Sequence, residues 1–302
     1  MNFDFLKPAK YFFVLSSIAT VASIVLVFVP GPRMSIEFTG GTRMEFATAT
    51  GTTTEKVAAA VQSFQVKEPL GSTINKIGNG NFLLRMRGLD TETHNQLIAH
   101  LNAKLGAVNE VQYTTIGPTV GETLKHRAAL ALLAASLGII LYLAIAFRKI
   151  PRRYSPWKFG VVAVLTLLHD VMITVGIFVI ISHYTAFEVD TLFVTALLTI
   201  LGYSVNDTII VMDRIRDNIF AQERKEDFSS LANRSVNQTW LRSCYTSGSV
   251  LIMLVALFFL GSESIKWFVL TLIVGILLGT YSSIFVATPL LVYWNDRTKK
   301  HS

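Results

Sequence analysis

Ionisable side chains within long apolar runs are the residues of this sequence that could carry chemistry. His169 and Asp170 lie in the middle of one run, and Asn206 and Asp207 lie near the end of the next. Arg242 stands just before a third run. Because an ionisable group within a membrane-spanning segment is costly, its presence indicates a function by default.

Proton transfer is the chemistry that these residue types favour. A low-dielectric environment favours the neutral form of a carboxylic acid, whereas a nearby cation favours its charged form. Asp207 with Arg242 beside it could therefore take up and release a proton, or the two could form a buried ion pair that only fixes helix packing. His169 and Asp170 could likewise carry protons or only pack.

Other kinds of chemistry are disfavoured. A metal site is not expected, because His169 and Asp170 are adjacent and project in different directions, with no third ligand evident. The single cysteine, Cys244, excludes an internal disulfide. No Ser–Lys or Ser–His pair lies at matched depths, so we expect neither an enzyme nor a bound cofactor.

The composition identifies the elements that must position these residues. Hydrophobic residues make up 51% of the 302-residue chain and charged residues only 16%, whereas a soluble domain has about 25% charged residues. A membrane-spanning helix needs about 20 apolar residues. The sequence therefore predicts an α-helical polytopic membrane protein with six transmembrane helices, in the runs 11–29, 128–147, 159–181, 189–212, 244–260 and 267–288.

The basic residues predict how the chain is oriented. Five Lys and Arg residues lie in 148–158 and six in 214–242, but 182–188 has none. Short basic loops stay on the cytoplasmic side, so both termini are expected there. The net charge of +7 is thus a signal of topology, and nucleic-acid binding is not expected. The first run is too long for a signal peptide and is expected to remain as an anchor.

The segment 30–127 has the charge balance of a soluble domain and is expected outside the membrane. Its pattern predicts strands at 34–39, 43–47, 72–77, 81–87 and 108–116, helices at 53–65 and 91–105, and a hairpin turn at Gly78-Asn79-Gly80. Apart from the first strand, this is the order of a ferredoxin-like α+β domain. We thus expect an N-terminus and first span at 1–29, an extracytoplasmic domain at 30–127, and the remaining five spans at 128–302.

Two further segments carry structural expectations. Pro30-Gly31-Pro32 and Gly117-Pro118, followed by Gly121, mark hinges on which the domain could move as a rigid unit. The segment 214–243 interleaves aromatic and basic residues, which predicts helices near the lipid headgroups.

Several motifs resemble one family. Phe38, Gly40, Gly41 and Thr42 form the F-x-G-G-T pattern of the SecD/SecF family of protein-export proteins. The segment 201–208 is similar to the fourth span of the SecF branch, and the residues around 169 and 242 also match. The motif residues in 201–208 are Gly202, Tyr203 and Ser204, followed by Asn206 and Asp207.

The resemblance implies a subunit of a proton-driven machine of the resistance-nodulation-division type in the bacterial cytoplasmic (inner) membrane. It implies SecD, the SecYEG channel, YajC and a translocating unfolded polypeptide as partners, with protons as the driving ion. The proton relay would consist of Asp207 and Arg242, with Asp170, His169 and Asn206 as further candidates. A scaffold that conducts no protons, or half of a small-molecule exporter, are the alternative interpretations.

Overall fold

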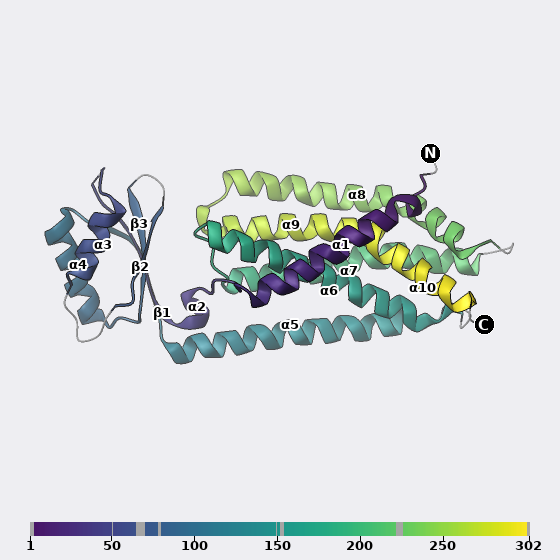
Figure 1. Ribbon diagram of the computed structural model, residues 1–302, viewed down its shortest axis with the longest axis horizontal. Coiled ribbons are helices and arrows are strands. Elements are labelled where there is room, and N and C mark those ends of the chain that lie inside the picture. The colour runs from purple at the N-terminus through teal and green to yellow at the C-terminus, as the bar shows by residue number, and fades with distance from the viewer. Residues whose placement is uncertain are drawn as a thin grey trace. The chain divides into compact units, whose positions relative to one another are not determined.

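The computed structural model describes residues 3–49, 51–64, 70–77, 80–148, 150–151, 154–221 and 226–300 (Figure 1). The chain divides into two compact units. The helical unit comprises Met1–Arg33, Leu130–Phe187 and Thr191–Ser302, and the sheet unit comprises Met34–Ala129 with Glu188–Asp190.

Six helical segments in the described chain are long and apolar enough to cross a membrane, as the sequence predicts. The first five are α1 (Leu6–Phe28), α5 (Pro118–Ala146), α6 (Pro156–Tyr184), α7 (Thr191–Phe220) and α8 (Phe228–Leu260). The sixth segment, Glu263–Asp296, contains α9 (Lys266–Ser282), a π-helical turn (Ser283–Ala287) and part of α10 (Thr288–Lys300). A short 3-10 helix, Glu263–Ile265, precedes α9.

Small residues bring the central helices of the bundle together. A Cβ atom added at Gly275 of α9 would overlap the side chain of Ile200 on α7, and one at Gly279 would lie 3.2 Å from the Cα of Ser204. The G-x-x-x-G spacing therefore serves close packing between α7 and α9 (Figure 1). Gly176 of α6 plays the same part against Ser23 of α1.

The segment 214–243 is helical before and after residues 222–225. These four residues, which include Arg224 and Lys225, lie outside the described residues. Phe228 and Leu231 are buried in the core of the bundle, and the ring of Trp240 contacts Phe3 and Phe5. The prediction of helices is correct, and although Phe228 and Leu231 pack inside the protein, Phe220 is exposed, so the proximity to lipid headgroups stays a prediction. Of the basic residues in 148–158, Lys149, Arg152 and Arg153 also lie outside the described residues.

The sheet unit interleaves four strands with two helices. In chain order these are β1 (Gly41–Ala47), α3 (Thr54–Gln62), β2 (Thr73–Ile77), β3 (Asn81–Met86), α4 (Thr91–Leu105) and β4 (Asn109–Ile116). The strand order is β2-β3-β1-β4, and every neighbouring pair is antiparallel. The two helices pack on one face of the sheet, over a core that includes Met44, Phe46, Val57, Phe82, Leu84, Leu97 and Leu101.

Most elements of this unit lie where the sequence predicts them, but the expected strand at 34–39 is wrong. Met34 forms only an isolated bridge with Val189, and Ile36–Thr39 is a short helix, α2. The hydroxyl of Ser35 accepts the N–H of Glu37 and so caps that helix, and Gly40 ends it. Of the predicted hairpin turn, residues 78 and 79 lie outside the described chain.

The expected hinge at 117–121 is a packed joint. A Cβ at Gly121 would lie 2.9 Å from the backbone nitrogen of Gly40, and one at Gly40 would lie 2.9 Å from the Cα of Pro118. Pro118 begins α5, and the boundary between the units falls further along, between Ala129 and Leu130. Residues 117–121 therefore belong to the sheet unit and hold the start of α5 against it.

Candidate functional site

Asp170 is the centre of a buried hydrogen-bond network in the helical unit. Its carboxylate Oδ1 lies 2.8 Å from Nδ1 of His169 on the same helix, α6. Its Oδ2 accepts the hydroxyl of Ser204 on α7 at 2.5 Å and that of Ser282, at the end of α9, at 2.7 Å. Asp170 is fully buried, and both of its oxygens have partners. Three helices thus meet at this carboxylate.

Asp207 on α7 is equally buried but is satisfied on one oxygen only. Its Oδ2 accepts the hydroxyls of Thr280 on α9 at 3.1 Å and Ser247 on α8 at 3.4 Å. Its Oδ1 is buried and has no hydrogen-bond partner among the described residues. The hydroxyls of Thr208 and Ser243 are also buried without a partner. The surroundings of Asp207 therefore retain unused capacity for hydrogen bonds.

The two carboxylates belong to one connected region. Ser204 and Asp207 are three residues apart on α7, which corresponds to about 4.5 Å along the helix axis. On α9, Thr280 reaches Asp207 and Ser282 reaches Asp170. Ser247 lies 2.5 Å from Thr280 and accepts the phenolic hydroxyl of Tyr203 at 3.1 Å. Hydroxyl groups on α7, α8 and α9 therefore surround both acids.

The structure does not place Arg242 against Asp207 as the sequence suggests. Arg242 is exposed on α8, whereas its neighbour Ser243 and, one turn further on, Ser247 are buried. Successive residues of a helix point about 100° apart, so the face that turns Ser243 inward turns Arg242 away. The hydrogen bonds to Asp207 come from neutral hydroxyls.

Asn206 and Gly202 lie on the exposed side of α7, away from the two acids. With Thr195 and Thr199 they form an exposed stripe of small and polar residues, which we call the α7 outer stripe. A Cβ at Gly202 would meet no atom of this chain within 4 Å. Small and polar residues of membrane helices are typical of contacts with another helix.

The glycine motif of the sheet unit is a structural element. Gly40 and Gly41 have φ values of +72° and +127°, which favour glycine, and a Cβ at Gly41 would lie 2.7 Å from the carbonyl oxygen of Met86. Phe38 is buried beside them, and Thr42 accepts the backbone N–H of Leu89 at 3.0 Å. The motif therefore joins α2, β1 and the start of α5 within the sheet unit.

Sequence patterns identify the acids more readily than their partners. His169, Asp170 and Asp207 stand out because charge is rare in an apolar run. Thr280 and Ser282 do not, because a hydroxyl in a membrane helix can bond to its own backbone. The signal that could have found them is the cluster of hydroxyl residues at 280–283.

Six helical segments long and apolar enough to cross a membrane, with two acids buried among them and a separate small α+β unit, are typical of a multi-pass membrane transport protein. A family model described as the C-terminal part of the protein export membrane proteins SecD and SecF matches residues 97–297. A second model, the SecD/SecF GG motif, matches residues 25–51. The chain therefore belongs to the SecD/SecF family of protein-export membrane proteins.

Individual relatives agree with this assignment. The chain is 37% identical to the protein translocase subunit SecF of Thermobaculum terrenum, over 97% of this chain and 94% of that protein. It is 35% identical to the protein translocase subunit SecDF of Bacillus subtilis, over 99% of this chain but 39% of that longer protein. The crystal structure of SecDF, a translocon-associated membrane protein from Thermus thermophilus, superposes with a TM-score of 0.85 at 34% identity, over 98% of this chain and 39% of that one.

Proposed function

We propose that the chain is the SecF-type subunit of the bacterial Sec protein-export machinery. In this role it couples proton movement through its buried acids to late steps of polypeptide translocation. The family assignment and the nearly full-length relatives named SecF support the first part. The unpartnered Oδ1 of Asp207 in the middle of the bundle is the observation that carries the second part.

Asp207 is the proton-carrying group in this proposal. Its Oδ2 is held by hydroxyls from α8 and α9, so Oδ1 is the position open to a proton or to a group that moves into contact. Asp170 and His169 form a second proton-binding site. Asp170 is hydrogen-bonded to Ser204, which lies about one helical turn from Asp207 on α7. One proton that crosses a potential of 100 mV releases about 2.3 kcal/mol, which is enough to shift helix packing by a modest amount.

Arg242 joins the relay through a movement of α8. A rotation of that helix by about 100° about its axis would turn Ser243 away from the interior and bring Arg242 into the inward position. A guanidinium beside Oδ1 would favour the carboxylate, and its departure would favour proton uptake. Movement of α8 and protonation of Asp207 are thereby linked.

SecD is the partner that we place on the α7 outer stripe. The exposed Gly202 and Asn206 suit close contact with another helix better than contact with lipid tails. The Bacillus subtilis relative, whose name and length combine SecD with SecF, supports such a pairing. The SecYEG channel, YajC and the unfolded polypeptide complete the proposed set of partners.

The sheet unit is, in our proposal, a ferredoxin-like domain on the outer side of the inner membrane. The order β2-β3-β1-β4 with helices after β1 and β3 supports this assignment. The excess of Lys and Arg in alternate loops supports cytoplasmic termini. The chain acts as a transport subunit and not as an enzyme.

The test replaces Asp207 by asparagine, which keeps the size of the side chain but cannot ionise. Asp207→Asn should reduce the proton-dependent part of protein export by about tenfold or more, equivalent to about 1.4 kcal/mol of coupling. Export into inverted membrane vesicles, with and without a proton gradient, measures this effect. Copurification with SecD confirms that the complex assembles.

Asp213→Asn is the matched control, because Asp213 pairs with Arg216 at the more exposed end of the same helix. It should retain proton-dependent export. Wild-type proton dependence in Asp207→Asn would overturn the relay and favour a scaffold that conducts no protons.

A further inference from the structure

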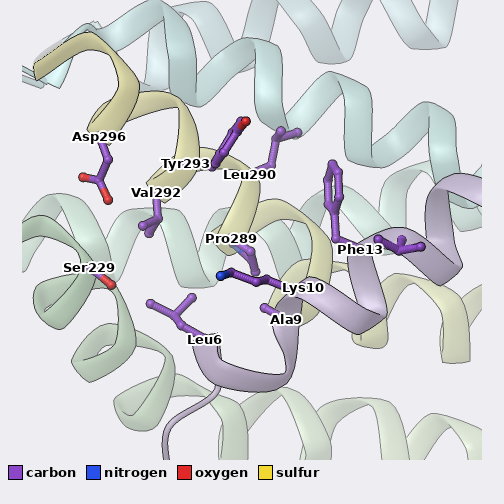
Figure 2. Close-up of a pocket in the computed structure, with 11 residues that line it drawn as sticks. Leu6, Ala9, Lys10, Phe13, Ser229, Pro289, Leu290, Val292, Tyr293 and Asp296 are labelled. Carbon is purple, nitrogen blue, oxygen red and sulfur yellow. The ribbon is translucent and has the colours of Figure 1, made fainter. Parts of the chain in front are cut away.

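Two cavities line the side of α1 in the helical unit. The larger, of about 870 Å³, lies at the end of the bundle where α1 begins and α10 ends (Figure 2). Figure 2 shows Lys10 of α1 together with Tyr293 and Asp296 of α10 around it. Charged and polar side chains therefore form part of the lining of this cavity.

The smaller cavity, of about 260 Å³, lies further into the bundle between α1 and α6. Ser16, Ser17 and Thr20 of α1 line it together with His169. Phe13 and Leu290 line both cavities, so the two spaces are neighbours along α1. The hydroxyls of Ser17 and Thr20 donate to backbone carbonyls of α1, which leaves their oxygens able to accept hydrogen bonds from water.

His169 directs an unused nitrogen to this region. Its side chain is only 8% exposed and lines the smaller cavity. Nδ1 is bound to Asp170, whereas Nε2 is buried without a hydrogen-bond partner among the described residues. Because a buried polar atom normally has a partner, we expect Nε2 to bind a ligand that the described residues do not supply. Water is the ligand that fits a space of this size beside hydroxyl groups.

We propose that the two cavities form one water-filled half-channel that leads protons between the end of the bundle bearing Lys10 and the imidazole of His169. Phe13 and Leu290 lie where the two cavities adjoin, since they border both. The inference rests on the proposed proton coupling and adds the route by which a proton reaches the buried acids.

In this half-channel, His169 passes a proton from water to Asp170 in two steps. Neutral His169 donates from Nδ1 to the Asp170 carboxylate and accepts a proton at Nε2 from a hydronium in the cavity, which leaves water. Release of the Nδ1 proton to Asp170 then gives neutral histidine and a neutral carboxylic acid. Asp170 is the titratable group that faces His169 on its own helix. Among the described residues, the neighbouring elements contribute no titratable group to the lining of the smaller cavity: α1 contributes hydroxyls, the π-helical turn contributes Val286, and α10 contributes Leu290.

Thiol accessibility tests the half-channel independently of export. In a Cys244→Ser background, single cysteines replace Thr20 or Ser17, which line the smaller cavity, and Ile18 or Leu15, which are exposed on α1 but do not line it. The full chain, assembled with SecD in inverted vesicles, is treated with a charged, membrane-impermeant methanethiosulfonate. Because a thiol reacts as its hydrated thiolate, we expect labelling of Thr20→Cys and Ser17→Cys to be about tenfold faster than that of the two controls.

Adding Phe13→Trp should slow the labelling of Thr20→Cys, and adding Phe13→Ala should speed it. Equal, slow labelling at all four positions would mean that lipid tails fill the space, and it would overturn the half-channel. That result would leave the Asp207 relay untouched, because labelling does not depend on transport. Conversely, a failure of Asp207→Asn to alter export would not change the labelling.

Discussion

At the scale of single residues, the two buried acids differ in what holds them. Asp170 accepts from a histidine and two serines, so it ties three helices together besides any part in proton transfer. Asp207 accepts on one oxygen from two hydroxyls at longer distances. Changes around Asp170 should therefore affect the stability of the bundle, whereas changes at Asp207 should affect coupling.

Ser282→Ala tests the structural part of Asp170. Loss of one hydrogen bond to a charged acceptor should lower the free energy of unfolding by about 1.5–3 kcal/mol. Ser283→Ala is the control, because its hydroxyl donates only to the backbone of Thr280 within the same helical segment. Thermal or denaturant unfolding of the purified chain in detergent measures both variants. An equal loss of unfolding free energy in Ser282→Ala and Ser283→Ala would contradict the conclusion that the hydrogen bond from Ser282 to Asp170 holds the helices together.

The positions of the acids could be predicted from the sequence, but the direction of Arg242 could not. A charge in an apolar run is visible without any structure, which is how His169, Asp170 and Asp207 were identified. The rotation of α8 about its axis is set by packing against α7 and α9, and a residue one position away from a buried one points about 100° to the side. The hydroxyl partners are equally invisible, because serine and threonine occur in membrane helices for several reasons.

At the scale of elements, the contact between α7 and α9 depends on glycine. Gly275→Ala would place a methyl group into Ile200 and should cost about 1–3 kcal/mol of stability. Gly248→Ala on α8 is the matched control, since nothing lies within 4 Å of its Cβ position and alanine favours the helix by about 1 kcal/mol. Unfolding in detergent should separate the two variants. Partial rescue of Gly275→Ala by Ile200→Val would assign the cost to this contact.

Helix α4, which is not one of the candidate membrane spans, offers a test of pH dependence. Asp90 caps it, and the hydrogen bond from the backbone N–H of Thr93 lowers the pKa of the Asp90 carboxyl. A lowered pKa stabilises the folded state above the ordinary value of about 3.9, and the stabilisation is lost as the pH falls through the folded pKa. Hydrogen exchange in residues 91–105, corrected for intrinsic rates, should therefore accelerate as the pH drops below about 4.

The control for this cap is Asp90→Asn, which can accept the same hydrogen bond but does not titrate. Its exchange in 91–105 should lack the acid step. An identical acid step in the wild type and in this variant would show that another group is responsible.

The elements themselves were largely predictable, because apolar runs and alternating patterns reflect burial directly. The strand predicted at 34–39 failed for a physical reason. Ile36 and Phe38 are both buried, as in a half-buried strand, but the hydroxyl of Ser35 caps a short helix and Gly40 ends it. The predicted spans were also shorter than the helices, since α7 and α8 continue into polar sequence that packs on the bundle.

For the molecule as a whole, the glycine motif matters because it packs closely against the first turn of α5 within the sheet unit. Gly40→Ala would set a methyl group 2.9 Å from Pro118 and force alanine to a φ of +72°. Gly51→Ala shares the positive φ, at +101°, but meets nothing within 4 Å. The left-handed backbone costs each variant about 1–2 kcal/mol. Any additional loss of stability in Gly40→Ala therefore measures the contact between Gly40 and Pro118.

We expect Gly40→Ala to reduce export and Gly51→Ala to leave it near the wild-type level, with both chains still copurifying with SecD. A disulfide engineered between α2 and the first turn of α5 should form less readily in Gly40→Ala. Equal export by the two variants would mean that the joint does not contribute to activity.

The exposure of α5 has a consequence for how the chain is supplied in the cell. Only 6% of its apolar window is buried, although Leu143 lies in the core and Leu132, Ala135 and Ile139 pack against the bundle, so most of its surface is left for lipid or another protein. If a partner covers this surface, a copy of the chain made without that partner would leave the surface in contact with lipid alone. In the Bacillus subtilis relative named SecDF, this chain matches 39% of one longer polypeptide, so the matched part and the remainder are synthesised in equal numbers.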